Sequence, residues 1–232
     1  MKRLTGYMAL LLLNMTACSS QPLSLSTNSA DIRDDGLVKV DNSQLDMSFI
    51  RPNVNWSQYT KLYFEPVKVT NDHASDYKPP RIDRHSDGVN ASYDLREQDL
   101  QKMADEFHLM TEKVFNKEQP FILVSEAEEG TLVVEVAVTD IRMTAPREDS
   151  RRSYSSMGKT FSQNSGSMVL LAKIKDGKTG QVLAKAADRG QGFDQWRQNT
   201  SVFNWGDVRT VYRSWANSLK NALIQAGAET QK

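Results

Sequence analysis

The sequence predicts an α/β domain of the α+β type, in which two helices pack on a mixed, mainly antiparallel sheet of about five strands. Three observations predict this fold class. Residues 94–115 and 204–226 show the apolar spacing of amphipathic helices. Other segments alternate apolar and polar residues with the period of a strand. A glycine-containing turn at residues 176–180 joins two of these segments as a hairpin. The expected element order is β-α-β-β-β-β-α.

The first strand is expected at residues 61–69, where Leu62 and Phe64 share one face. Ordered structure should begin shortly before it, near residue 48. Residues 71–93 contain two adjacent prolines and many charges without periodicity, which predicts a long loop.

The first helix has the clearest pattern. Asp94 is the expected N-cap, since Glu97 follows three residues later as in a capping box. The helix should end before Pro120, because proline disfavours helical geometry in the residue that precedes it. Its apolar stripe consists of Leu100, Met103, Ala104, Phe107, Met110, Val114 and Phe115.

Two strand patterns follow this helix. Residues 121–124 form a continuous apolar run, which is typical of a strand covered on both faces. Residues 131–141 alternate, with Leu132 and Val138 on one face and Ile141 on the other, and this pattern predicts a central strand.

The second half of the chain predicts a hairpin, two loops and a helix. Residues 167–175 and 181–188 alternate on either side of the turn and should pair antiparallel. The polar residues 144–165 and 190–201 predict loops. The final helix should begin near Asn204, stop at Gly227 and lie on the same face of the sheet as the first. Its stripe consists of Trp205, Val208, Val211, Tyr212, Trp215, Leu219, Leu223 and Ala226.

The first twenty residues are typical of an export signal. Lys2 and Arg3 precede an apolar run at residues 8–13, which is too short to span a bilayer that needs about 20 apolar residues. Thr16 and Ala17 then precede Cys18, the only cysteine in the chain. This order resembles the lipobox of bacterial lipoproteins, in which the cysteine is acylated. The resemblance implies a lipid anchor. Ser19 stands where such lipoproteins carry an aspartate when they stay at the inner membrane, so this residue favours the outer membrane at its periplasmic face.

The expected division of the chain follows from this signal. Residues 1–17 are the signal peptide, and residues 18–47 are the lipidated N-terminus and a flexible linker rich in Ser, Asn and Asp. Within the linker, residues 36–40 could form a short edge strand. Residues 48–228 form a single domain, and residues 229–232 are a tail.

Five segments carry a resemblance to a known family. Asn55-Trp56-Ser57-Gln58-Tyr59 leads into the first strand, and the strand at residues 132–141 ends in Val-Thr-Asp-Ile. The other segments are residues 176–183, with a Lys-Thr-Gly-Gln turn, residues 187–189 and residues 205–216. Together they resemble the family of bacterial lipoproteins known as domain of unknown function 3313. This resemblance implies a lipoprotein of the Gram-negative envelope and no particular activity.

Composition and motifs argue against several classes of function. The 29 basic and 29 acidic residues leave no net charge to attract nucleic acid. The sequence has no Gly-x-Ser-x-Gly, His-Glu-x-x-His, Walker or Gly-x-Gly-x-x-Gly motif, so no enzyme activity and no cofactor are expected. A loop contains residues with metal-binding chemistry, but their spacing matches no metal motif and no metal is expected. These residues are His73, Asp76, Asp83, His85 and Asp87.

Two groups of residues are candidates for a site. Asp188 and Arg189 lie where the last predicted strand ends, and Asp140 and Arg142 lie at the end of the strand expected to neighbour it. The four could form a polar site or simply fix a loop. The aromatic residues Trp196, Phe203 and Trp205 could mark a partner surface or pack beneath the last helix.

Three functions remain open at this point. The first is a non-enzymatic binding or scaffolding module of the envelope, with a protein or glycan partner and an undetermined oligomeric state. The second is a carrier of a small ligand or lipid, with a pocket between sheet and helices. The third, an envelope hydrolase, would require a polar triad.

Labelling cells with palmitate tests the anchor. We expect the wild-type protein to take up label and to fractionate with membranes, because Cys18 carries acyl chains. The Cys18→Ser variant should take up none. Absence of label on the wild-type protein, or its release with soluble periplasmic contents, would show that the placement is wrong.

Overall fold

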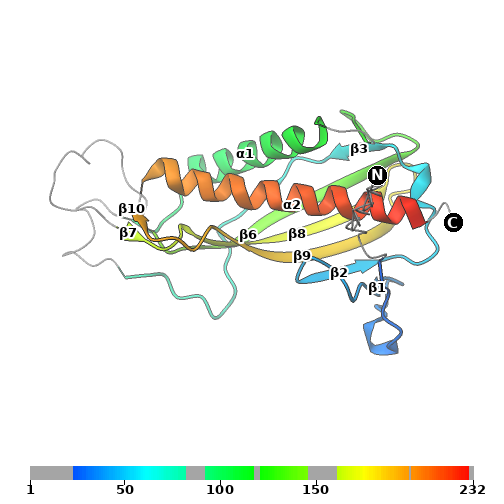
Figure 1. The fold of residues 1–232 in the computed structure, drawn as a ribbon, viewed down its shortest axis with the longest axis horizontal. Helices are drawn as coiled ribbons and strands as arrows, with labels where there is room; N and C mark the ends of the chain where they lie inside the picture. The colour runs from blue at the N-terminus through cyan, green and yellow to red at the C-terminus, as the bar shows by residue number, and fades with distance from the viewer. Residues whose placement is uncertain (1–22, 82–91, 118–120, 146–160, 199, 230–232) are drawn as a thin grey trace, which may run out of the picture.

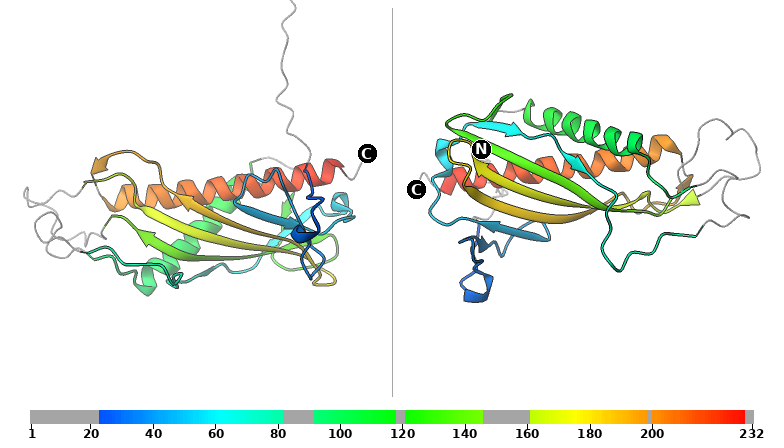
Figure 2. Two further views of the ribbon diagram at one scale, coloured as in Figure 1. Left: turned by 90° about the horizontal axis from the view of Figure 1, so that it is seen from below. Right: turned by 180° about the vertical axis from the view of Figure 1, so that it is seen from behind.

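The structure, a computed structural model, describes residues 23–81, 92–117, 121–145, 161–198 and 200–229. The predicted signal peptide and Cys18 lie outside the described residues. One curved sheet carries both helices on the same face, as Figure 1 and the two views in Figure 2 show. The predicted fold class is confirmed.

Among the described residues the main sheet has eight strands, more than the five or so expected, because two strands precede residue 61 and the first predicted strand is divided in two. Its order is β1-β2-β9-β8-β6-β3-β5, and β4 also pairs with β6. The strands are β1 (Val38–Lys39), β2 (Met47–Ile50), β3 (Lys61–Phe64), β4 (Lys68–Val69), β5 (Ile122–Leu123), β6 (Thr131–Met143), β8 (Gly166–Asp176) and β9 (Val182–Gln191). A separate antiparallel pair consists of β7 (Phe161–Ser162) and β10 (Arg197–Gln198). Two 3₁₀ turns, η1 (Ser29–Asp31) and η2 (Trp56–Gln58), precede β3.

Strand β6 is central, as predicted. It pairs antiparallel with β8 and parallel with β3 and β4, while β8 and β9 form the predicted hairpin. The single strand expected at residues 61–69 is divided into β3 and β4. Pro66 lies between them, and proline has no N–H to continue the ladder.

Strand β5 corrects one expectation. The apolar run at residues 121–124 predicted a strand covered on both faces, but β5 lies at the edge of the sheet, where it pairs with β3 alone. Ile122 is 52% exposed. An apolar run without alternation therefore did not indicate two-sided burial here.

A β-bulge near the end of β6 corrects the expectation that Ile141 faces away from Leu132 and Val138. Thr139 pairs with Val169 and Arg142 with Ser167, so that Asp140 and Ile141 together face Met168. The extra residue reverses the alternation, and Ile141 joins the buried cluster that contains Leu132 and Val138 instead of facing away from it.

The ordered fold begins earlier than predicted. Residues 23–47 were assigned to the linker, but Leu37 is fully buried, and β1 forms within the predicted edge segment. The polar residues that suggested a tether are used locally: Asn28 caps η1, and Ser43 hydrogen-bonds to Ser48.

Helix α1 (Glu97–Phe115) begins later than expected. The Asp99 carboxylate accepts a hydrogen bond from the Arg96 N–H at 3.0 Å, so Arg96 is the N-cap in place of Asp94. Its predicted stripe packs into the main core, including Met103, Phe107 and Met110.

Helix α2 (Ser201–Glu229) is longer than predicted at both ends and passes Gly227 without stopping. Its first half lies very close to the end of β9, where one glycine of the strand and one just after it face the helix. A Cβ on Gly190 would meet Val211 and lie 2.7 Å from Trp215 Cζ2, and a Cβ on Gly192 would lie 2.5 Å from the Asp207 carboxylate. This close approach requires residues without a side chain.

Substituting the glycine under α2 should therefore destabilise the fold. We expect Gly190→Ala to lower the free energy of unfolding by about 1–3 kcal/mol, because the methyl group overpacks the helix contact. Gly206→Ala is the control, since Gly206 lies within α2 and a Cβ there meets nothing within 4 Å. It should raise stability by up to about 1 kcal/mol. Equal effects of both changes in chemical denaturation would contradict this packing.

Candidate functional site

Three of the four residues of the predicted polar site meet on the face of the sheet that lacks helices. The Asp140 carboxylate accepts hydrogen bonds from Arg142 Nε at 2.9 Å and from Arg189 Nη2 at 2.6 Å. Asp188 does not join them. It points toward α2, where its carboxylate accepts a hydrogen bond from Trp215 Nε1 at 2.7 Å.

This polar cluster holds the loop that follows β4. Arg142 Nη2 donates to Asp76 at 2.9 Å, and the His73 ring, stacked on Tyr77, places Nδ1 3.5 Å from the Asp140 carboxylate. The Asp140 N–H also donates to the carbonyl of Asp72 at 2.8 Å. The cluster therefore acts as an attachment point for the loop.

The electrostatics of Asp140 fit that structural role. The residue is 5% exposed and has a φ of 47°, a left-handed conformation that Asp tolerates better than most residues. Burial alone would raise the pKa of its carboxyl, but hydrogen bonds from Arg142 and Arg189 outweigh burial and hold this pKa well below its usual range. Asp140 is thus a permanently charged partner for two arginines.

A second set of ion pairs covers the middle of the same face. The Glu135 carboxylate lies 2.7 Å from Lys175 Nζ and 3.0 Å from Lys173 Nζ. Hydrogen bonds from Lys175, then from Lys173, lower the pKa of Glu135 to about 2. This face of the sheet is therefore polar along much of its length.

The three candidate aromatic residues do not form one described surface. Trp196 is 74% exposed beside β10, whereas Trp205 packs against the core and has Lys102 Nζ 4.0 Å from its ring centre. The side chain of Phe203 lies outside the described residues. Next to Trp196, Arg197 forms an ion pair with the buried Asp207, which also accepts hydrogen bonds from Ser165.

Only two of the five loop residues with metal-binding chemistry belong to the described residues. His73 and Asp76 belong to the polar cluster, while Asp83, His85 and Asp87 lie outside the described residues. In the part of the chain that the structure describes, no three His, Cys, Asp or Glu side chains are grouped to bind a metal.

The helix-covered face contains a cavity of about 360 Å³. It lies between the second half of α2 and the strands β2, β8 and β9. Large apolar side chains surround it, among them Trp56, Phe64, Phe107, Trp215 and Leu219. A pocket between sheet and helices is the feature that the carrier hypothesis requires.

Small residues explain why this space is open. Ala184 and Ala186 on β9 and Ala172 on β8 face the helix, and Ala216 and Ala226 of α2 face the sheet. Larger residues at these positions would fill the space, as residues of core strands usually do. Ala184 and Ala186 occupy alternate positions of β9, and this spacing is visible in the sequence. A period of two predicts a strand, but it does not say whether the space beside small residues is filled or empty.

The cavity lining also includes a few polar residues and one buried hydroxyl. Asn42, Ser43 and Asn221 belong to the lining. Thr111 is 3% exposed, and its hydroxyl has no hydrogen-bond partner among the described residues. An apolar interior with few polar groups is the usual form of a ligand pocket.

None of the described helices combines the length and the apolar character that a bilayer crossing requires.

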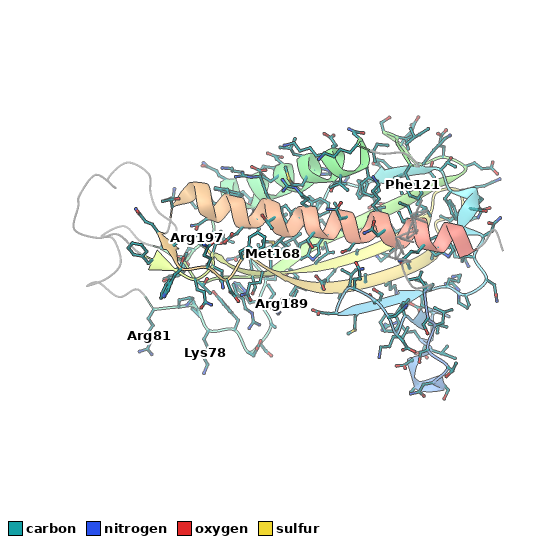
Figure 3. The ribbon with its side chains drawn as sticks, in the orientation of Figure 1. Lys78, Arg81, Phe121, Met168, Arg189 and Arg197 are labelled. Atoms are coloured by element: carbon teal, nitrogen blue, oxygen red, sulfur yellow. The ribbon has the colours of Figure 1, made fainter. Side chains whose placement is uncertain are left out.

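Figure 3 shows Arg189 and Arg197 near one end of the sheet, with Lys78 and Arg81 on the loop beneath.

Comparison with known protein families identifies one family. The model of the family described as protein of unknown function (DUF3313) matches residues 28–219. No curated protein matches the sequence.

Three solved structures show a weak likeness. The PelC dodecamer of Paraburkholderia phytofirmans has 10% identity and a TM-score of 0.36, covering 75% of this chain and 97% of that one. Protein XCC0632 of Xanthomonas campestris, of family DUF330, has 13% identity and a TM-score of 0.37, covering 78% and 94%. The hypothetical protein CT253 of Chlamydia trachomatis has 8% identity and a TM-score of 0.32, covering 74% and 95%.

Neutralising the centre of the polar cluster should cost stability in a pH-dependent way. We expect Asp140→Asn to lower the free energy of unfolding at pH 7 by about 2 kcal/mol, between the values typical of exposed and buried ion pairs. Because the folded-state pKa is lowered, this stabilisation is present above the unfolded value of about 4 and is lost as pH falls below it.

Wild-type protein should therefore lose more stability than Asp140→Asn between pH 5 and pH 3, about one unit either side of that value. The control is Asp34→Asn, at an exposed aspartate outside the polar cluster, which should change neither quantity. Parallel pH profiles for wild type and Asp140→Asn in thermal unfolding would contradict the assignment.

Proposed function

The chain belongs to the DUF3313 family of proteins of unknown function, and we propose that it is a non-enzymatic binding module of the bacterial cell envelope that holds an apolar chain between β9 and α2. In this proposal Cys18 anchors the protein by its acyl chains to the outer membrane at the periplasmic face. The ligand class joins two of the hypotheses drawn from the sequence, the binding module and the lipid carrier.

The cavity is the observation that carries the proposal. Its volume of about 360 Å³ falls within the range of about 300–1,000 Å³ that is usual for small-molecule sites. Its lining is mostly apolar with a few polar residues, so an apolar ligand with a polar end would fit it. Each methylene group buried there contributes about 0.8 kcal/mol.

The state of the polar residues supports a role without catalysis. A hydrolase needs a nucleophile beside a base that can accept its proton. The predicted polar site instead pairs Asp140 with two arginines, and Asp207 pairs with Arg197. These carboxylates are occupied in holding loops and strands together.

A second candidate function rests on exposed aromatic side chains at the other end of the sheet. Phe161, Phe193 and Trp196 are all more than half exposed. Such residues are enriched in binding surfaces, so a protein or glycan partner in the envelope could dock there. Trp196→Ala should then abolish crosslinking of that partner in intact cells without affecting the cavity.

Filling the cavity tests the main proposal. The probe is cis-parinaric acid, a fluorescent fatty acid, and the protein is the chain from Ser19 onward, which contains every described residue and carries no acyl chain. We expect saturable binding, and we expect Ala186→Phe to weaken it by about tenfold or more, which corresponds to about 1.4 kcal/mol.

Ala187→Phe is the matched control. It makes the same change one residue along β9, on the opposite face, where Ala187 pairs with the exposed Leu171. It should leave the affinity unchanged. No saturable binding by the unmodified chain, or equal losses in both variants, would contradict the proposal.

A further inference from the structure

We infer that the apolar chain in this cavity is one of the acyl chains attached to the protein's own Cys18. The inference rests on the proposed function. That function gives the class of ligand, an apolar chain, and the inference names where the chain comes from. It also explains why an apolar site and a lipid anchor occur in one small protein.

The N-terminal segment enters the fold at the cavity. Leu23, the first described residue, is part of the cavity lining and packs against the main core. The following residues are held in place, because the Ser24 N–H donates to Asn42 Oδ1 at 2.8 Å and the Ser26 N–H donates to the Lys39 carbonyl at 2.9 Å. Asn42 itself belongs to the cavity lining.

The distance from this entry point to the anchor is short. Cys18 precedes Leu23 by five residues, and an extended chain spans at most about 3.6 Å per residue. The Cα atom of Cys18 therefore lies within about 18 Å of that of Leu23, whatever the conformation between them. An acyl chain on Cys18 begins close to the cavity.

Attachment gives this acyl chain an advantage over free lipids. A ligand joined by a short flexible linker has an effective concentration in the millimolar range. A free fatty acid must reach a comparable concentration to displace it.

The alternative for an acyl chain away from the membrane is exposure to water, which costs about 0.8 kcal/mol for each methylene group. While the protein is away from the membrane, the cavity would shelter one acyl chain. The remaining chains would enter the leaflet when the protein is anchored.

The form of the cavity suits a chain that enters with its apolar end first. Trp215 and Phe107 belong to the lining, whereas Asn42 and Ser43 contribute polar groups to it. Asn42 also holds Ser24, next to Leu23, where the N-terminal segment enters. The polar linkage to Cys18 would stay beside these two residues.

Photocrosslinking by the protein's own lipid tests the inference. Cells are grown with a fatty acid that carries a diazirine at its terminal carbon, the labelled membranes are irradiated, and crosslinked peptides are mapped by mass spectrometry. We expect the acyl chain on Cys18 to crosslink to β9 around Ala186 and to residues 216–226 of α2. Ala186→Phe should reduce these crosslinks by about tenfold, and Ala187→Phe should not.

Isotopically heavy Cys18→Ser protein, mixed in before irradiation, shows whether the crosslink is internal. Crosslinks from light to light protein alone support the inference, and crosslinks from light to heavy protein overturn it. Labelled Cys18 that crosslinks only to lipid, or no label on Cys18 at all, also overturns it.

A second arm separates these failures from failure of the proposed function. The same diazirine fatty acid is added free to the chain from Ser19 onward and irradiated. If free fatty acid crosslinks at Ala186 and residues 216–226 in this arm while the acyl chain on Cys18 does not, the cavity is an apolar binding site and only the inference about Cys18 fails. Their absence in both arms would reject both proposals.

Discussion

The fit of α2 on β9 determines most of the features of this molecule. Gly190 and Gly192 let the first half of the helix lie directly on the strand, and the hydrogen bond between Trp215 and Asp188 holds that half in place. A straight helix can follow a twisted sheet closely over only part of its length. Beyond Trp215 several of the facing residues are alanines, and the space between helix and sheet becomes the cavity.

The opposite face of the sheet shows how the polar residues are used. The bulge at Asp140 turns one carboxylate outward, and two arginines from β6 and β9 converge on it. The same residue binds the backbone of the loop after β4 through its N–H. A left-handed residue at a polar cluster often marks a functional site, but here the ion pairs explain it as an attachment point.

Local patterns predicted the regular elements and missed what depends on tertiary contacts. The stripe of α1, the central position of β6 and the β8–β9 hairpin follow from periodicity and turn chemistry. The bulge at Asp140 does not, because it is stabilised by Asp72 and Arg189, which are distant in sequence. The period of two in a strand already implies that Asp188 and Arg189 point to opposite faces, so only one of them could join a cluster with Asp140. The cavity was not predictable in position, since it depends on where α2 stops touching the sheet.

An anomalous diffraction experiment would locate the ligand directly. Crystals of the chain from Ser19 onward are soaked with a fatty acid that carries bromine on its terminal carbon, and data are collected at the bromine absorption edge. We expect one strong peak between Ala186 and the second half of α2. A peak only at the molecular surface, or none at saturating fatty acid, would show that this cavity does not hold an apolar chain.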